Sequence, residues 1–159
     1  MEKQDIQLYN LNSSDTIEYQ KQLFEQYKLY VELADRTSQR RIAANNFFIA
    51  ANASLLTIAS WFKDNFGTYI YLISIVGIII SLFWFFLIRS YKQLNTGKFK
   101  VIHELEKKLP ACVFDYEWKV LGKGKSFKNY WQISHIEMAV PFIFSFLYVA
   151  VSLIYCLKI

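Results

Sequence analysis

Histidine, cysteine, proline and glycine are all scarce in this sequence of 159 residues, which contains two, two, two and five of them respectively. So few histidines and cysteines form no group with the spacing of a metal site. They also form no Ser/His/Asp or Cys/His arrangement of the kind that nucleophilic enzymes use. The sequence therefore predicts a protein that is not an enzyme and that holds no cofactor and no metal ion.

Charged residues are almost missing from three stretches of about 20 residues each, at 42–62, 68–88 and 136–157. A helix of that length, at about 1.5 Å per residue, crosses the roughly 30 Å hydrocarbon core of a bilayer. A soluble bundle of this size has too few other residues to cover three such segments. We therefore predict an all-α protein with three transmembrane helices, at 42–62, 68–88 and 135–157.

Lysine and arginine are distributed unevenly around these spans. Residues 1–41 and 89–134 contain 16 of the 18, and the short link 63–67 contains one. Positively charged segments stay on the cytoplasmic side. We therefore expect the N-terminus and 89–134 in the cytoplasm, and the link and the C-terminus outside. This topology separates Cys112 from Cys156 in depth, so no disulfide is expected.

Both polar segments are predicted to form a cytoplasmic helical layer. The helix that Asp15 is expected to cap has no breaker before Ile42, so it should continue into the first span. Packing against protein suits it better than lying on the bilayer, because its polar face carries as much Glu as Lys. The second span should stop near 95–97, where Gly97 follows Asn95 and Thr96. Shorter helices then bury a cytoplasmic cluster of Phe99, Ile102, Leu105, Trp118 and Leu121.

The third span has a recognisable start. Ser134 and Glu137 have the spacing of a capping box, which predicts Ser134 as the N-cap. Pro141 lies one turn further along, where it should kink the helix or mark its entry into lipid.

The first span is unusual because amides and hydroxyls interrupt it. Small and polar side chains recur there at spacings of three and four, which places them on one face of a helix. Asn45 and Asn52 border that face. We call its members the small-polar stripe: Ala43, Asn46, Ala50, Ala53, Thr57 and Ser60.

Lipid offers an amide no hydrogen-bond partner, so the small-polar stripe should face something else. One interpretation is a helix–helix interface, within a subunit or between subunits, where small residues allow close approach. The other is the lining of a wet pore at the axis of a ring. Asn45 and Asn52 belong to the same candidate interface or pore lining.

The run "GKGKS" at 122–126 contains the Gly-Lys-Ser ending of a phosphate-binding loop. The complete motif needs a glycine five positions before Gly124, where Lys119 stands, and it needs a preceding strand. The segment is better interpreted as a solvated basic turn near lipid headgroups. A nucleic-acid partner is not expected, because the aromatic residues of 89–134 fall on the inward sides of its helices.

The run "SYKQLNTGKFKVIHELEKKLP", followed by "DYEWKVLGKGK" and "HIEMAVP", resembles small bacterial inner-membrane proteins of the RipA-like octameric family. The resemblance covers roughly residues 40 to 150 and is strongest from 90 to 141. It implies three membrane spans and a homo-octamer, and it implies no catalytic residues.

Two classes of function remain open. The first is a homo-oligomeric scaffold of the bacterial inner membrane whose cytoplasmic layer binds a protein partner. The second is an oligomeric channel or pore-type effector gated by that layer. In both, the expected partners are other copies of the chain and membrane lipids.

Overall fold

The computed structural model describes residues 8–9, 16–61, 67–124, 130 and 132–157. Every regular element in these ranges is helical, and three of the helices are long and apolar enough to cross a membrane. The predicted all-α class and the three candidate spans are thus confirmed. The elements are α1 (Ile17–Trp61), α2 (Gly67–Glu106), α3 (Val113–Val120), the 3-10 turn η1 (Gly122–Gly124) and α4 (Ile133–Leu157).

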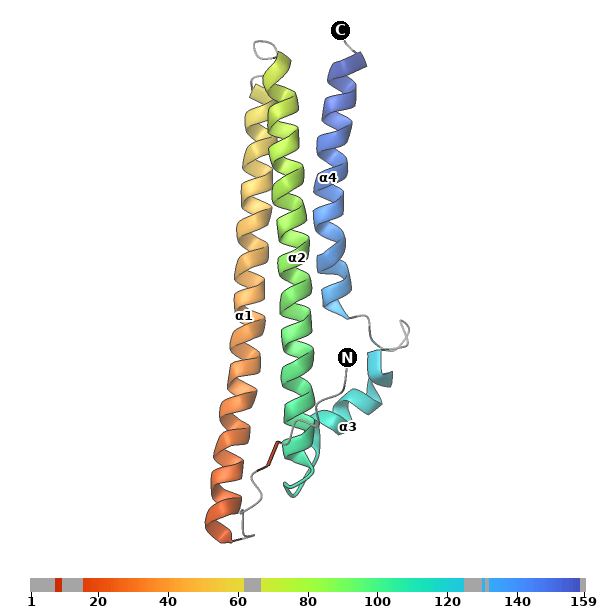
Figure 1. Cartoon of the computed structure of the whole chain (residues 1–159). Helices are drawn as coiled ribbons and strands as arrows, with labels where there is room; N and C mark the ends of the chain where they lie inside the picture. Colours follow the sequence, from red (N-terminus) through yellow and green to blue (C-terminus); the bar gives the residue numbers. More distant parts are fainter. Residues whose placement is uncertain (1–7, 10–15, 62–66, 125–129, 131, 158–159) are drawn as a thin grey trace, which may run out of the picture.

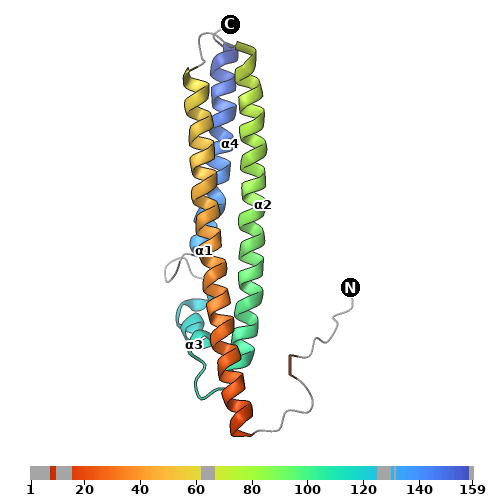
Figure 2. The same cartoon turned by 90° about the vertical axis from the view of Figure 1, so that its left-hand side faces the viewer.

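The two longest helices form an antiparallel hairpin, and α2 lies between α1 and α4 (Figure 1). Helix α4 covers one half of this hairpin, and α3 lies beside the other half (Figures 1 and 2). The 45 residues of α1 extend over roughly 65 Å, about twice the hydrocarbon thickness. The molecule therefore has a spanning half, which contains α4, and a polar layer. The polar layer consists of α1 up to Arg41, α2 from Arg89 onward, and α3.

Helix α1 runs without interruption from the polar layer into the spanning half, as predicted. Thr16 caps its start: its Oγ1 accepts a hydrogen bond from the backbone N–H of Tyr19 over 3.3 Å, and its carbonyl accepts one from the N–H of Gln20 over 3.1 Å. Asp15, the expected cap, lies outside the described residues.

The predicted break in α2 near 95–97 is wrong, because α2 continues to Glu106. A glycine inside a helix costs only about 1 kcal/mol. Beyond Gly97, α2 buries Ile102 and Leu105, which are 0% and 6% exposed. Burial of two large aliphatic side chains stabilises the continued helix by more than this cost.

A buried carboxylate connects three helices in the polar layer. Glu106, the last residue of α2, is 0% exposed. It accepts hydrogen bonds from the backbone N–H groups of Phe114 (2.9 Å) and Asp115 (3.1 Å) in the first turn of α3, and from the hydroxyl of Tyr27 on α1 (3.0 Å). Cys112, the N-cap residue, provides no side-chain cap. Glu106 thus supplies the N-terminal capping that the sequence of α3 lacks.

The environment of Tyr27 changes its acidity. Burial, and then the hydrogen bond to Glu106, raise the pKa of Tyr27 to about 12. Burial disfavours the charged phenolate, and a phenolate would also lie beside the carboxylate of Glu106. Both causes therefore favour the neutral phenol.

The five residues of the predicted cytoplasmic cluster differ in burial. Ile102 and Leu105 are buried, and the half-buried ring of Phe99 meets that of Phe114, with centroids 5.8 Å apart. Trp118 and Leu121 are half-buried further along the chain. The indole of Trp118 lies beside Gly124, one of two glycines in η1 with positive φ. The two buried members, Ile102 and Leu105, therefore both lie on α2.

Candidate functional site: the two faces of α1

Within the spanning half, α1 presents two different polar faces. Asn45 and Asn52, seven residues or two turns apart, are 9% and 0% exposed. Both contact α2 through their side chains. All six members of the small-polar stripe are exposed at the surface of the protomer. The structure therefore separates the two buried amides from the rest of the candidate residues.

Asn52 is the point where the three spanning helices meet. Its Nδ2 donates to the carbonyl of Phe48 (2.8 Å), and its Oδ1 accepts from the hydroxyl of Ser81 on α2 (3.2 Å). Its backbone carbonyl accepts a hydrogen bond from the hydroxyl of Tyr148 on α4 (3.1 Å). Every polar atom of the Asn52 side chain has a partner within the subunit.

Small residues of α2 allow this approach. The ring of Tyr148 occupies the space into which a Cβ at Gly77 would project. Ser74 and Ser81, which lie one turn to either side on the same face, are also buried. A larger side chain at Gly77 would push α4 away from α2, and the hydroxyl of Tyr148 would then miss α1.

Asn45 has a different partner. Its Oδ1 accepts a hydrogen bond from Nε1–H of Trp84 over 2.9 Å. The indole of Trp84 is 1% exposed and stacks on the ring of Phe48, with centroids 5.8 Å apart and an interplanar angle of 8°. The amide thus satisfies the one polar atom of a buried tryptophan.

An ion pair closes the junction of α1 and α4 beside the polar layer. Nε of Arg41 lies 3.2 Å from Oε2 of Glu137, and the two side chains are 16% and 15% exposed. The predicted capping box is therefore wrong: α4 begins at Ile133, so Ser134 already lies inside the helix. Glu137 binds a distant arginine instead of the start of its own helix.

The small-polar stripe has few partners within the subunit. The hydroxyl of Thr57 donates to the carbonyl of Ala53 (2.9 Å), and that of Ser60 donates to the carbonyl of Thr57 (2.7 Å). The exposed amide of Asn46 has no hydrogen bond among the described residues. In lipid such an amide costs free energy unless another molecule satisfies it.

The sequence of this chain matches a known protein family. A family model described as the octameric membrane protein family (8xMP) matches residues 24–157. The chain belongs to the octameric membrane protein family. The match covers α1 from Phe24 onward and the whole of α2, α3 and α4, and it extends further toward the N-terminus than the resemblance seen in the sequence. The family's name implies an assembly of eight copies. No curated protein and no solved structure matches the chain.

Several contacts of the site have no signal in the sequence. Trp84, Tyr148 and Arg41 each find a partner on another helix, far away in the chain. Their residue types are common at such positions, and no spacing identifies the partner. Among the described residues, no three His, Cys, Asp or Glu side chains gather closely enough to hold a metal ion.

Proposed function

We propose that the protein is a homo-oligomeric scaffold of the bacterial inner membrane whose subunits contact one another through the small-polar stripe of α1. The observation that carries this proposal is the separation of polar groups on α1. The amide oxygens of Asn45 and Asn52 accept hydrogen bonds inside the subunit, while Asn46 faces outward. Membership of an octameric family supplies the other copies that the outward amide needs.

Physical chemistry supports helix association through this face. No strong hydrophobic effect operates between helices in lipid, so association depends on close packing and on interhelical hydrogen bonds. Ala50 and Ala53 permit close approach, and Asn46 lies on the same face to donate and accept. Each amide hydrogen bond in this setting contributes about 0.6–2 kcal/mol.

The polar layer is proposed to lie in the cytoplasm and to bind a protein partner. The Lys and Arg asymmetry and the resemblance to RipA-like proteins support that orientation and the inner membrane. Helix α3 supports the proposal of a protein partner, because the apolar side chains of Val113, Tyr116 and Val120 are 59%, 70% and 62% exposed. The proposal includes no catalysis, since the site consists of packing and hydrogen bonds.

A pore is the alternative function. Thr57 and Ser60 place hydroxyls on the same exposed face as Asn46, and a ring of subunits that turned this face inward would line a wet axis. Amides and hydroxyls suit weakly selective passage, because the stripe itself contains no charge.

The proposed contact is tested by one bulky substitution with a matched control. Ala53→Leu places a large side chain in the stripe. Ser54→Leu places the same side chain about 100° further around the helix, since successive residues are about 100° apart. Both positions are exposed in the protomer. We expect Ala53→Leu to lower the mass of the purified particle and Ser54→Leu to leave it unchanged. An intact particle for Ala53→Leu, or loss of both particles, would contradict a contact through the stripe.

Asn46→Leu distinguishes the scaffold from the pore. If the amide joins subunits, the particle mass falls, and unaltered leakage through reconstituted vesicles is expected for any particle that remains. If the stripe lines a wet axis, the mass is kept and solute flux falls as the wall becomes apolar. Unchanged mass with unchanged flux would overturn both functions for this face.

A further inference from the structure

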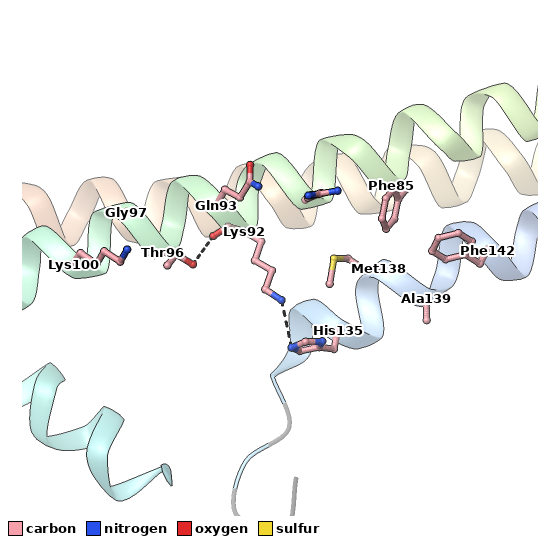
Figure 3. Close-up of a pocket in the computed structure, with 11 residues that line it drawn as sticks. Phe85, Lys92, Gln93, Thr96, Gly97, Lys100, His135, Met138, Ala139 and Phe142 are labelled. Carbon is pink, nitrogen blue, oxygen red and sulfur yellow. Dashed lines mark hydrogen bonds between the residues drawn. The ribbon is translucent and has the colours of Figure 1, made fainter. Parts of the chain in front are cut away.

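A cavity of about 860 Å³ opens between α2 and α4, where the polar layer meets the spanning half (Figure 3). We call it the interhelical pocket. Arg89, Lys92 and Lys100 of α2 line it together with His135 near the start of α4. Their spacing along α2 keeps the three cations on one face of the helix. The pocket therefore combines a large volume with a concentration of positive charge.

The described part of the chain provides no opposite charge to the cations of the interhelical pocket. Arg89, Lys92 and Lys100 form no ion pair with an acidic residue within the described part of the chain, and no acidic residue described there lines the pocket. Nζ of Lys92 lies 3.4 Å from Nε2 of His135, a hydrogen bond that brings side chains of α2 and α4 together in the pocket (Figure 3). An anion bound in the pocket would relieve the repulsion among Arg89, Lys92 and Lys100.

The other end of the pocket is apolar. Phe85 and Met138 line it beside Phe142, and the rings of Phe85 and Phe142 have centroids 5.0 Å apart. These residues lie on the spanning side of the cations, as Figure 3 shows along α2 and α4. One cavity thus changes from hydrocarbon-like to cationic along the direction in which a bilayer changes from acyl chains to headgroups.

The pocket lies at the level of the lipid headgroups, and one part of its wall is open. Arg89 directly follows the uncharged stretch 68–88, which places it at the level of the lipid phosphates. A Cβ at Gly97 would meet nothing within 4 Å, so the pocket wall is open at this point of α2. The hydroxyl of Thr96, another lining residue, donates a hydrogen bond to the carbonyl of Lys92 over 2.9 Å, and this bond lies within α2.

We propose that the interhelical pocket binds an anionic phospholipid. Its phosphate would lie among Arg89, Lys92 and His135, and an acyl chain would pass along Phe85 and Phe142. Basic pockets between transmembrane helices recognise anionic headgroups in this way. Such a lipid would hold α4 against α2 at the edge of the polar layer. The site is independent of the small-polar stripe, which lies on α1.

Native mass spectrometry of the delipidated, full-length oligomer tests the proposal, with phosphatidylglycerol and phosphatidylcholine as probes. We expect phosphatidylglycerol to bind with at least about tenfold higher affinity, because each nearby cation contributes about a fivefold gain for an anionic headgroup. Lys92→Gln should weaken phosphatidylglycerol binding about fivefold, and Arg89→Gln with Lys92→Gln about 25-fold. Lys92→Arg should restore the affinity. Equal binding of the two lipids would overturn the proposal.

Lys98→Gln is the matched control. Lys98 carries the same charge on the same helix, but its Nζ lies 5.2 Å from the ring centroid of Tyr30 on α1, away from the pocket. We expect its lipid affinity to remain within about twofold of the wild type. A loss equal to that of Lys92→Gln would show a diffuse surface attraction and contradict a site. Displacement of the lipid by millimolar inorganic phosphate would identify a free-anion site and contradict the lipid. The particle mass of each variant, measured in the same spectra, shows whether the oligomer persists.

Discussion

The phenol of Tyr27 and the carboxylate of Glu106 lie 79 residues apart in the sequence, and their oxygen atoms lie 3.0 Å apart in the structure. The same carboxylate accepts hydrogen bonds from two backbone N–H groups of α3. One buried side chain therefore holds α1, α2 and α3 together in the polar layer. Its partners, and not its own charge, explain why a carboxylate is tolerated at zero exposure.

Glu106→Ala should destabilise the polar layer. The substitution leaves two N–H groups of α3 and the hydroxyl of Tyr27 without their acceptor, at a cost of about 3 kcal/mol. Glu104→Ala is the control, because Glu104 is exposed and, among the described residues, its carboxylate pairs with Lys107, which directly follows α2. Its expected effect is within about 0.5 kcal/mol. Thermal unfolding in detergent, followed by circular dichroism, measures both. Equal melting temperatures for the two variants would show that Glu106 does not hold α3.

Alkaline pH should weaken the contact between Tyr27 and Glu106. The folded state raises the pKa of Tyr27 from 10.0 to about 12, so the unfolded chain loses this proton first. The stabilisation is therefore complete below about pH 10 and is lost as the pH rises toward 12. Tyr27→Phe removes the titrating group and leaves all other groups unchanged. The stability difference between wild type and Tyr27→Phe should be larger at pH 8 than at pH 11. A difference that is constant over this range would contradict the raised pKa.

Two glycines of α2 should respond in opposite directions to the same substitution. Gly77→Ala pushes a methyl group into the ring of Tyr148, and the ring must move together with α4, which overpacking data put at about 1–3 kcal/mol. Gly97→Ala meets nothing within 4 Å and gains about 1 kcal/mol of helix propensity. Melting temperatures in detergent give both signs. A destabilised Gly97→Ala variant would indicate that the surface near Gly97 is covered in the assembled particle.

The sequence predicts the elements of this fold better than their ends. The continuity of α1 follows from the absence of a breaker before Ile42, which is a local property. The end of α2 does not follow from its local sequence. Gly97 is a weak stop signal, and the burial of Ile102 and Leu105 against other helices outweighs it.

Pairing between distant residues is the part that local patterns miss. Ser134 and Glu137 have the spacing of a capping box, yet Glu137 binds Arg41 from another helix. Glu104 and Glu106 look alike in the sequence, and only packing makes one an exposed surface charge and the other a buried cap. Likewise, the spacing of Asn45 and Asn52 predicts a shared face, but it does not reveal that side chains of α2 donate hydrogen bonds to both amide oxygens within the subunit.

The distribution of Lys and Arg predicts the orientation of the protein in the membrane. The cytoplasmic side should hold 1–41 and 89–134, which contain 16 of the 18 basic residues. Single cysteines are introduced at Asn65, which lies outside the described residues, and at Glu117, which is exposed on α3. The background carries Cys112→Ser and Cys156→Ser. In intact cells, an impermeant maleimide should label Asn65→Cys and leave Glu117→Cys unlabelled until the membrane is opened. The opposite labelling pattern would place the polar layer outside and would remove the basis for a cytoplasmic partner.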